Sequence, residues 1–256
     1  MMRRTNKRLG QGLGLVLAAF ALTASVTPVE SAHAGACASV QRYAAGFAAA
    51  ADSVVPADGG VLFVPTLVSG TRRPAAPGAS TTPEESLRRG TRALRSERVE
   101  LAPGWFVLRP QRRTTGAITG LIGTEQRAFV AGPASTEPLP PPVRPSLRYY
   151  PSRQVQGPRG PSTTSEYNSL ALGGRAPAGA YGVVVRSVTA EGSPAAADGF
   201  ALPIDTPEQT SFTFSPSGGR CQPSRPGNVA SHGQDVEVLF VDAVGRTSEA
   251  VAVRVR

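Results

Sequence analysis

The stretch VEVLFVDAVGRTSEAVAVRVR, residues 236–256, decides the fold. In residues 251–255 valines alternate with alanine and arginine, which is the period of a strand with one buried face. Residues 236–241 form a second apolar run, with Val236, Val238 and Phe240 on one face. The turn between the runs, 242–246, includes a glycine that can take a positive φ. The stretch therefore predicts an antiparallel hairpin that buries one face.

Similar short runs, bounded by Gly, Pro and Thr, recur along the rest of the chain, and we expect each to form a strand. Seven of them in the second part of the sequence have the spacing of an antiparallel sandwich. The predicted strands are 60–68, 97–101, 104–110, 116–122 and 127–132, then 146–152, 165–172, 180–190, 200–204, 210–215, 236–241 and 249–256.

Two segments allow helical structure. Residues 37–53 are rich in alanine, with Val40, Phe47 and Ala51 spaced to share one helical face. Residues 85–98 are dense in arginine and allow a helical turn, which a glycine within them weakens. We expect an all-β protein with a short N-terminal helix as its one further element.

A proline-rich segment divides the chain. Residues 137–145, EPLPPPVRP, hold five prolines and favour an extended connector. The sequence therefore predicts two tandem immunoglobulin-like or fibronectin type III-like sandwiches, at 35–136 and 146–256, joined by this linker.

The first 34 residues have the pattern of a secretory signal peptide. MMRRTNKR is basic, residues 13–26 are apolar, and Ala32-His33-Ala34 supplies a small-residue cleavage signal. We expect cleavage after residue 34 and a periplasmic, secreted or cell-surface protein without a transmembrane segment. The minor alternative is a lipoprotein anchored at Cys37, for which the apolar run lies too far upstream.

Charge says little about partners. Residues 1–34 hold four of the 27 basic and one of the 18 acidic residues, so cleavage lowers the net charge from +9 to +6. Every basic residue that remains is arginine, which GC-rich codon usage explains as well as function does.

Two cysteines also remain, Cys37 and Cys221, and in an oxidising compartment we expect them to form a disulfide.

Short motifs in both halves resemble those of known families of β-sandwich modules. The turn in VDAVGRTSEAVAVRV, 241–255, is similar to the D-x-x-G-x-x-S hairpin that closes many fibronectin type III and immunoglobulin-like modules. The first half resembles bacterial immunoglobulin-like modules, with PADG at 56–59 before Val64-Pro65, LAPGWF at 101–106, and FVAGP at 129–133. The resemblance implies extracellular β-sandwiches used as spacer, adhesion or interaction modules, with no chemistry of their own.

Nothing in the sequence singles out a catalytic constellation. After cleavage His232 is the one imidazole left, it lies in a polar loop, and no G-x-S-x-G elbow accompanies it. No H-E-x-x-H, C-x-x-C or P-loop occurs, so we expect no metal or cofactor. Asp58, Asp198 and Asp242 occur in patterns also found in calcium loops, but turn formation explains them better.

The arginine-dense segment offers a candidate binding surface. Arg88, Arg89, Arg92 and Arg95 are candidate polyanion contacts, and Arg109, Arg112 and Arg113 could extend the same basic face. Trp105 and Phe106, the nearby aromatic residues, are expected in the core, so we expect no specific nucleic-acid binding. The alternative is a solvated charged loop.

These observations predict a non-enzymatic structural or binding protein with an unidentified protein or polysaccharide partner at the cell envelope. The alternative function is a small secreted hydrolase on a β scaffold, using a carboxylate pair or His232.

Overall fold

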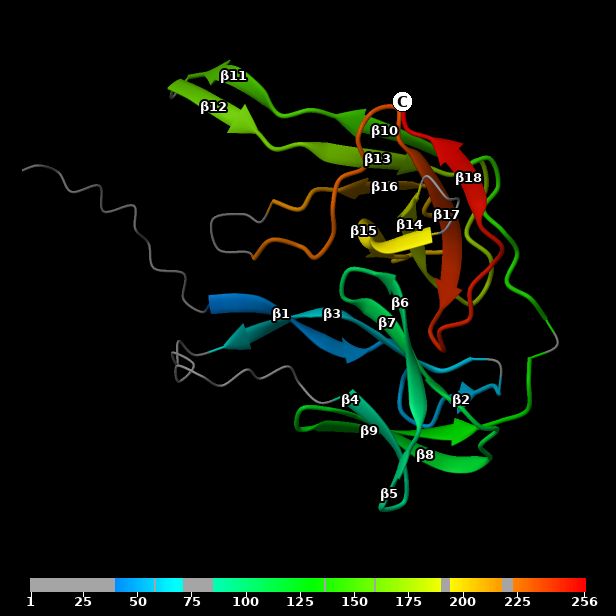
Figure 1. The fold of residues 1–256 in the computed structure, drawn as a ribbon. Helices are drawn as coiled ribbons and strands as arrows, with labels where there is room; N and C mark the ends of the chain where they lie inside the picture. Colours follow the sequence, from blue (N-terminus) through cyan, green and yellow to red (C-terminus); the bar gives the residue numbers. More distant parts are fainter. Residues whose placement is uncertain are drawn as a thin grey trace, which may run out of the picture. The chain divides into compact units, whose positions relative to one another are not determined.

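The computed structural model describes residues 40–57, 59–70, 85–135, 137–158, 160–189, 194–217 and 223–256, and in these residues it contains strands and no helix (Figure 1). The all-β prediction is confirmed. No described element is a helix that could cross a membrane. The predicted signal peptide, Cys37, Cys221 and Asp58 lie outside the described residues, so the statements about them stay predictions.

The first half contains two sheets. In the order β1-β3-β7-β6, the four-stranded sheet joins β1 Val40–Phe47, β3 Val61–Gly70, β7 Trp105–Pro110 and β6 Ser96–Ala102, all antiparallel. The five-stranded sheet joins β2 Val54–Val55, β9 Glu125–Ala131, β8 Gly116–Ile122, β4 Glu85–Arg89 and β5 Arg92–Leu94. Its short β2–β9 pairing is parallel, and its other pairings are antiparallel.

The two sheets of the first half pack face to face around an aromatic core. Phe63 stacks on Phe106 with ring centroids 4.9 Å apart, and Phe47 lies against Phe63 and Phe129. Leu87 of β4, which is fully buried, joins the same cluster. Burial of these side chains removes apolar area from water and stabilises the sandwich.

The second half also has two main sheets and a separate hairpin. One sheet has the order β10-β13-β16, with β10 Ser146–Tyr150, β13 Tyr167–Ala171 and β16 Ser211–Phe214. The other has the order β15-β14-β17-β18, with β15 Pro194–Pro203, β14 Ala180–Val188, β17 Asp235–Asp242 and β18 Val251–Arg254. β11 Arg153–Gly157 and β12 Gly160–Thr164 form the hairpin, which extends from β10 and β13 (Figure 1).

The hairpin predicted at residues 236–256 is present. β17 and β18 are antiparallel, with Val236 opposite Val253 and Val238 opposite Val251. Val236, Val238 and Phe240 lie in the core between the two sheets, as their alternation predicts. Arg256, which follows β18, adds a contact with the other sheet: its amide donates to the Leu147 carbonyl at 3.0 Å, and its carbonyl accepts from the Tyr149 amide at 2.8 Å.

A third apolar cluster joins the two halves. It combines Leu62, Trp105 and Val107 from β3 and β7 with Val184, Leu239 and others from β14, β15 and β17. Along β7, β14 and β17, successive residues alternate between this cluster and the core of their own half. Two sheets, β1-β3-β7-β6 and β15-β14-β17-β18, are therefore covered on both faces.

The halves thus pack as four layers of sheet, and residues 37–256 form one compact unit. No described strand pairing crosses from one half to the other. The domain boundary at 137–145 stays a prediction, since the shared cluster joins what the linker was expected to separate.

Both helical expectations are wrong for the described residues. Where a helix was expected at 37–53, β1 begins at Val40 and pairs along its length with β3, and this long-range pairing outweighs the helix propensity of the alanines. The segment 85–98 forms β4, a turn, β5 and the start of β6. Gly90, with φ +57°, makes that turn, so the glycine that weakens a helix here supports a hairpin.

Candidate functional site

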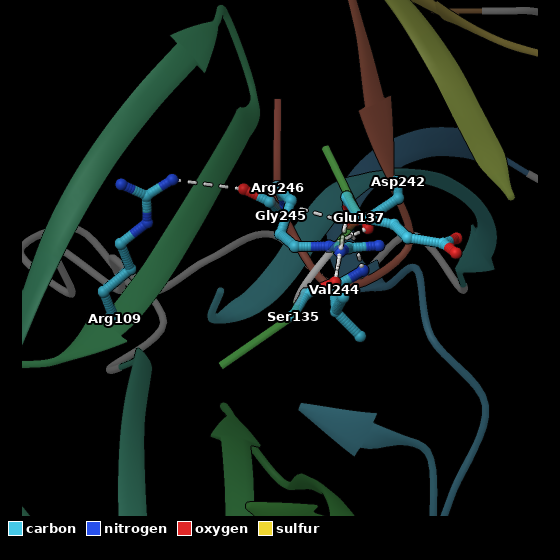
Figure 2. Close-up of polar contacts among 7 residues, drawn as sticks. All are labelled: Arg109, Ser135, Glu137, Asp242, Val244, Gly245 and Arg246. Atoms are coloured by element: carbon cyan, nitrogen blue, oxygen red, sulfur yellow. Dashed lines mark hydrogen bonds and ion pairs between the residues drawn. The ribbon is translucent and has the colours of Figure 1, made fainter. Parts of the chain in front are cut away.

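Two features outside the cores can carry function: the contact between the halves and a pocket lined by arginine. The contact centres on the turn at residues 242–246, here called the docking turn, which follows β17 and reaches the first half. Figure 2 shows Arg109 of β7 pointing its guanidinium toward the backbone of this turn.

Two hydrogen bonds to backbone carbonyls fix the docking turn against β7 and the residue before β3. Arg109 Nη2 donates to the carbonyl of Gly245 at 3.2 Å, and the amide of Gly60 donates to the carbonyl of Val244 at 2.8 Å. Gly245 has φ +74°, and a Cβ there would lie 2.6 Å from both methyl groups of Val107. Glycine is required at this position both for its conformation and for close packing.

The docking turn is held in shape by Asp242, which is buried. Its Oδ1 accepts from the amides of Val244 and Arg246, and its Oδ2 accepts from Nε of Arg246 at 2.6 Å. The Arg246 guanidinium also donates to the Ser135 hydroxyl and, at 3.0 Å, to the Glu137 carbonyl (Figure 2). Asp242 therefore forms a turn, as predicted, and its partner arginine contacts the start of the proline-rich segment.

Aromatic packing completes the contact. The rings of Trp105 and Tyr181 lie 5.9 Å apart between centroids, tilted by 55°. Gly182 follows on β14, where a Cβ would lie 2.8 Å from the Trp105 ring. Burial in this contact raises the pKa of the Tyr181 hydroxyl above its ordinary value, since the phenolate would lose hydration.

The sequence prediction missed this contact, although the sequence contains a signal for it. The runs VLFV in β3, WFVL in β7, VVV in β14 and VLFV in β17 are continuously apolar. A sheet with one face in water shows alternation, whereas continuous apolar runs are typical of strands that are buried on both faces.

The second feature is a pocket of about 720 Å³ at one end of the first half. It lies where the chain crosses twice between the two sheets, from β5 to β6 and from β7 to β8. Its charged lining residues are five arginines, which we call the arginine pocket: Arg89, Arg92, Arg95, Arg112 and Arg113.

Three of the four predicted polyanion contacts line this pocket. Arg89, Arg92 and Arg95 do so. Arg88 does not, because side chains alternate along a strand and Arg88 is on the opposite face of β4 from Arg89. Arg112 and Arg113 belong to the pocket, but Arg109 does not, since it contacts the docking turn.

The arginine pocket has no compensating negative charge in its lining. No carboxylate is among the residues that line it, and none of its five guanidiniums forms an ion pair or hydrogen bond within the part of the chain that the structure describes. These uncompensated positive charges create a positive electrostatic potential in the pocket, which favours binding of an anion.

Residues proposed for chemistry are dispersed. His232 is exposed in a turn before β17, and neighbouring Asp235 pairs with Arg254 at 2.7 Å. Asp198 lies on β15 instead of in a turn, and is the one carboxylate lining a smaller pocket of about 210 Å³ in the second half. Within the described ranges, no group of three His, Cys, Asp or Glu residues has the arrangement of a metal site.

Comparisons with known proteins complete the description. No family model matches the chain, and no curated protein matches it. Among solved structures, dimeric latent PorU from Porphyromonas gingivalis has a TM-score of 0.26 and 10% identity, covering 84% of this chain and 20% of the other. The FN1–FN3 domains of chicken CNTN1 have a TM-score of 0.24 and 8% identity, covering 81% and 67%.

This chain thus spans about a fifth of the length of the PorU chain and two thirds of the CNTN1 chain. With TM-scores this low, neither structure assigns a function to this chain.

Proposed function

We propose that the chain is a non-enzymatic structural and binding protein of the cell envelope, exported by its N-terminal segment, in which two β-sandwiches act as one rigid body. Loops at the ends of the sandwiches would contact a protein or polysaccharide partner. The observation that carries this proposal is the buried contact between the halves.

A rigid pair of sandwiches suits a spacer or adhesion module. Interfaces between domains that move relative to each other are mostly polar, whereas large apolar interfaces restrict motion. Here Leu62, Trp105, Val184 and Leu239 are all at most 4% exposed within the shared cluster. The docking turn adds two hydrogen bonds to this packing, from the Arg109 guanidinium and from the Gly60 amide.

The arrangement of titratable groups supports a non-enzymatic role. General acid–base catalysis needs a proton-transfer group beside the reacting atoms, usually in a cleft that shifts its pKa. Of the two pockets described above, the larger has arginines as its charged lining residues, and the smaller has one exposed carboxylate, Asp198, among its lining residues.

Calorimetry on the chain that begins at Gly35 tests the rigid body. We expect one cooperative unfolding transition with equal calorimetric and van't Hoff enthalpies. Two separate transitions, assigned to the halves by limited proteolysis between residues 137 and 145, would contradict it. The hydrolase alternative gains support if ester, peptide or glycoside hydrolysis is detected and disappears in His232→Ala.

A further inference from the structure

We propose that the arginine pocket binds an anionic polysaccharide through sulfate, carboxylate or phosphate groups on its sugar units. This deepens the proposed function, which names a protein or polysaccharide partner but assigns it to no particular residues. It rests on the proposed function only for the extracytoplasmic location, where such polymers occur.

The first wall of the pocket places like charges together. Arg89 and Arg92 are directly opposite each other on β4 and β5, flanking the turn at Gly90 and Thr91. Like charges that face each other across two strands destabilise a sheet. Because no described carboxylate offsets this repulsion, folding does not explain the pair, whereas binding of an anion does.

The second wall comes from the loop between β7 and β8. The amide of Gln111 donates to the carbonyl of Arg95 at 2.9 Å, which fixes the loop beside the crossing from β5 to β6. Arg112 and Arg113 follow directly, and the Thr114 hydroxyl donates to the Arg112 carbonyl at 3.0 Å. Two segments separated in sequence therefore bring five guanidiniums to one pocket.

Two other arginines of the same two sheets, Arg98 and Arg127, behave differently. Arg98 pairs with Glu85 and Glu100 at 2.8 and 2.6 Å, with its guanidinium 3.6 Å from the centroid of the Phe106 ring. Arg127 donates to the Ala49 carbonyl at 2.8 Å. Arg98 and Arg127 therefore have partners within the protein, whereas no ion pair or hydrogen bond is formed by the guanidiniums of the pocket among the described residues.

Size and donor geometry suit a ligand with several anionic groups. A volume of about 720 Å³ lies in the range of ligand pockets, roughly 300–1,000 Å³. Each guanidinium presents a planar fork of donors that can bind two oxygens of a sulfate, carboxylate or phosphate. Five forks in one pocket can bind groups on neighbouring sugar units.

Two other classes of polyanion fit the lining less well. Proteins that bind single-stranded nucleic acid stack bases on aromatic rings, and the uncharged lining residues here are Ala93, Leu94, Gln111 and Thr114. Peripheral membrane binding combines basic residues with exposed apolar side chains that enter the bilayer. None of the large exposed hydrophobic residues of the described chain lines this pocket.

The test measures binding of heparin, a sulfated polysaccharide, to the chain that begins at Gly35, by titration calorimetry. The variant Arg89→Ala/Arg92→Ala/Arg95→Ala should bind at least about tenfold more weakly, because charge-assisted hydrogen bonds are lost. The control Arg148→Ala/Arg153→Ala/Arg175→Ala removes the same charge from exposed positions in the second half and should bind like the wild type. Equal loss in both variants, or no loss in either, would overturn the proposal.

Two further variants separate geometry from charge and from misfolding. Arg89→Lys/Arg92→Lys/Arg95→Lys keeps the charge and loses the forks, so it should also bind more weakly than the wild type. Wild-type affinity in this variant would overturn a built pocket. If the alanine variant does not keep the wild-type unfolding temperature, Arg112→Ala/Arg113→Ala on the loop provides the same comparison.

Other polyanions identify the ligand class. Polygalacturonate should compete with heparin, and neutral dextran should not. Single-stranded DNA, or vesicles containing phosphatidylglycerol, that bound tighter than either polysaccharide and with the same arginine dependence would overturn the polysaccharide assignment. Failure to bind any polysaccharide, together with a single unfolding transition, would refute this site and leave the proposed function intact.

Discussion

Trp105 of β7 and Tyr181 of β14 pack ring against ring across the contact between the two halves, with centroids 5.9 Å apart. Trp105 is 4% exposed, and its neighbour Phe106 points the other way, into the core of the first half. A single strand therefore supplies one aromatic residue to the core and the next to the interface.

Replacing Trp105 with alanine should destabilise the protein by about 3–5 kcal/mol, the usual effect of emptying a buried aromatic site. Urea unfolding followed by circular dichroism measures this loss of stability. Tryptophan fluorescence is unsuitable because Trp105 is the one tryptophan of the chain and the variant lacks it. Val130→Ala, at a position 41% exposed on β9, is the control and should change stability by less than about 0.5 kcal/mol. A Trp105→Ala variant as stable as this control would refute the interface.

Alanine at Gly245 should be more destabilising than alanine at Gly116. Both glycines have positive φ, +74° and +84°, so each substitution costs about 1–2 kcal/mol from the backbone. A Cβ at Gly116 meets nothing within 4 Å, whereas at Gly245 it meets Val107 at 2.6 Å. We expect an excess of about 1–3 kcal/mol at Gly245, from overpacking.

The same urea measurement on both variants isolates the packing effect. Equal losses would mean that the docking turn does not press on Val107. A Gly245→Ala/Val107→Ala double variant should recover part of the excess, because the second substitution removes the methyl groups that the new Cβ meets.

Stability should fall at alkaline pH through Tyr181. Burial raises the pKa of this hydroxyl in the folded state, so above the ordinary value of 10.0 the unfolded chain releases a proton that the folded protein retains. Its contribution is therefore fully present below pH 10 and is lost as the pH rises toward the folded pKa. Urea titrations from pH 8 to 11 should show a shallower decline for Tyr181→Phe, and an identical decline would contradict the assignment.

The N-terminal segment predicts the mature start of the protein. Expressed with residues 1–34, the protein should leave the cytoplasm and begin at Gly35, which intact mass of the exported product measures. A mass showing a lipidated Cys37 would support the lipoprotein alternative, and retention of residues 1–34 would contradict both. Peptide mapping without reductant on the same sample tests the Cys37–Cys221 disulfide.

Alternation and apolar runs predicted the strands that carry the cores. All twelve ranges given above coincide with strands, because each supplies side chains such as Phe63, Phe129 or Phe240 to a buried face. β1, β2, β4, β5, β11 and β12 were not predicted. In β11 and β12 nearly every residue is exposed, and β4 has one buried residue, Leu87, so no hydrophobic period marks them.

The candidate sites were less predictable than the strands. The arginine-rich segment is evident in the sequence. The sequence does not show that the turn at Gly90 places Arg89 and Arg92 in one pocket with Arg112 and Arg113. That convergence depends on which strands pair, and pairing is a property of the whole fold. The interface depends likewise on two sheets each being apolar on both faces.

The apolar outer face of β3 and β7 has a further consequence while the chain is being made. Synthesis proceeds from the N-terminus, and the residues that cover Leu62 and Val107 in the structure lie on β14, β15 and β17. The first sandwich is therefore complete before its cover and exposes an apolar sheet for that interval. Chains at this stage are vulnerable to aggregation until β17 arrives.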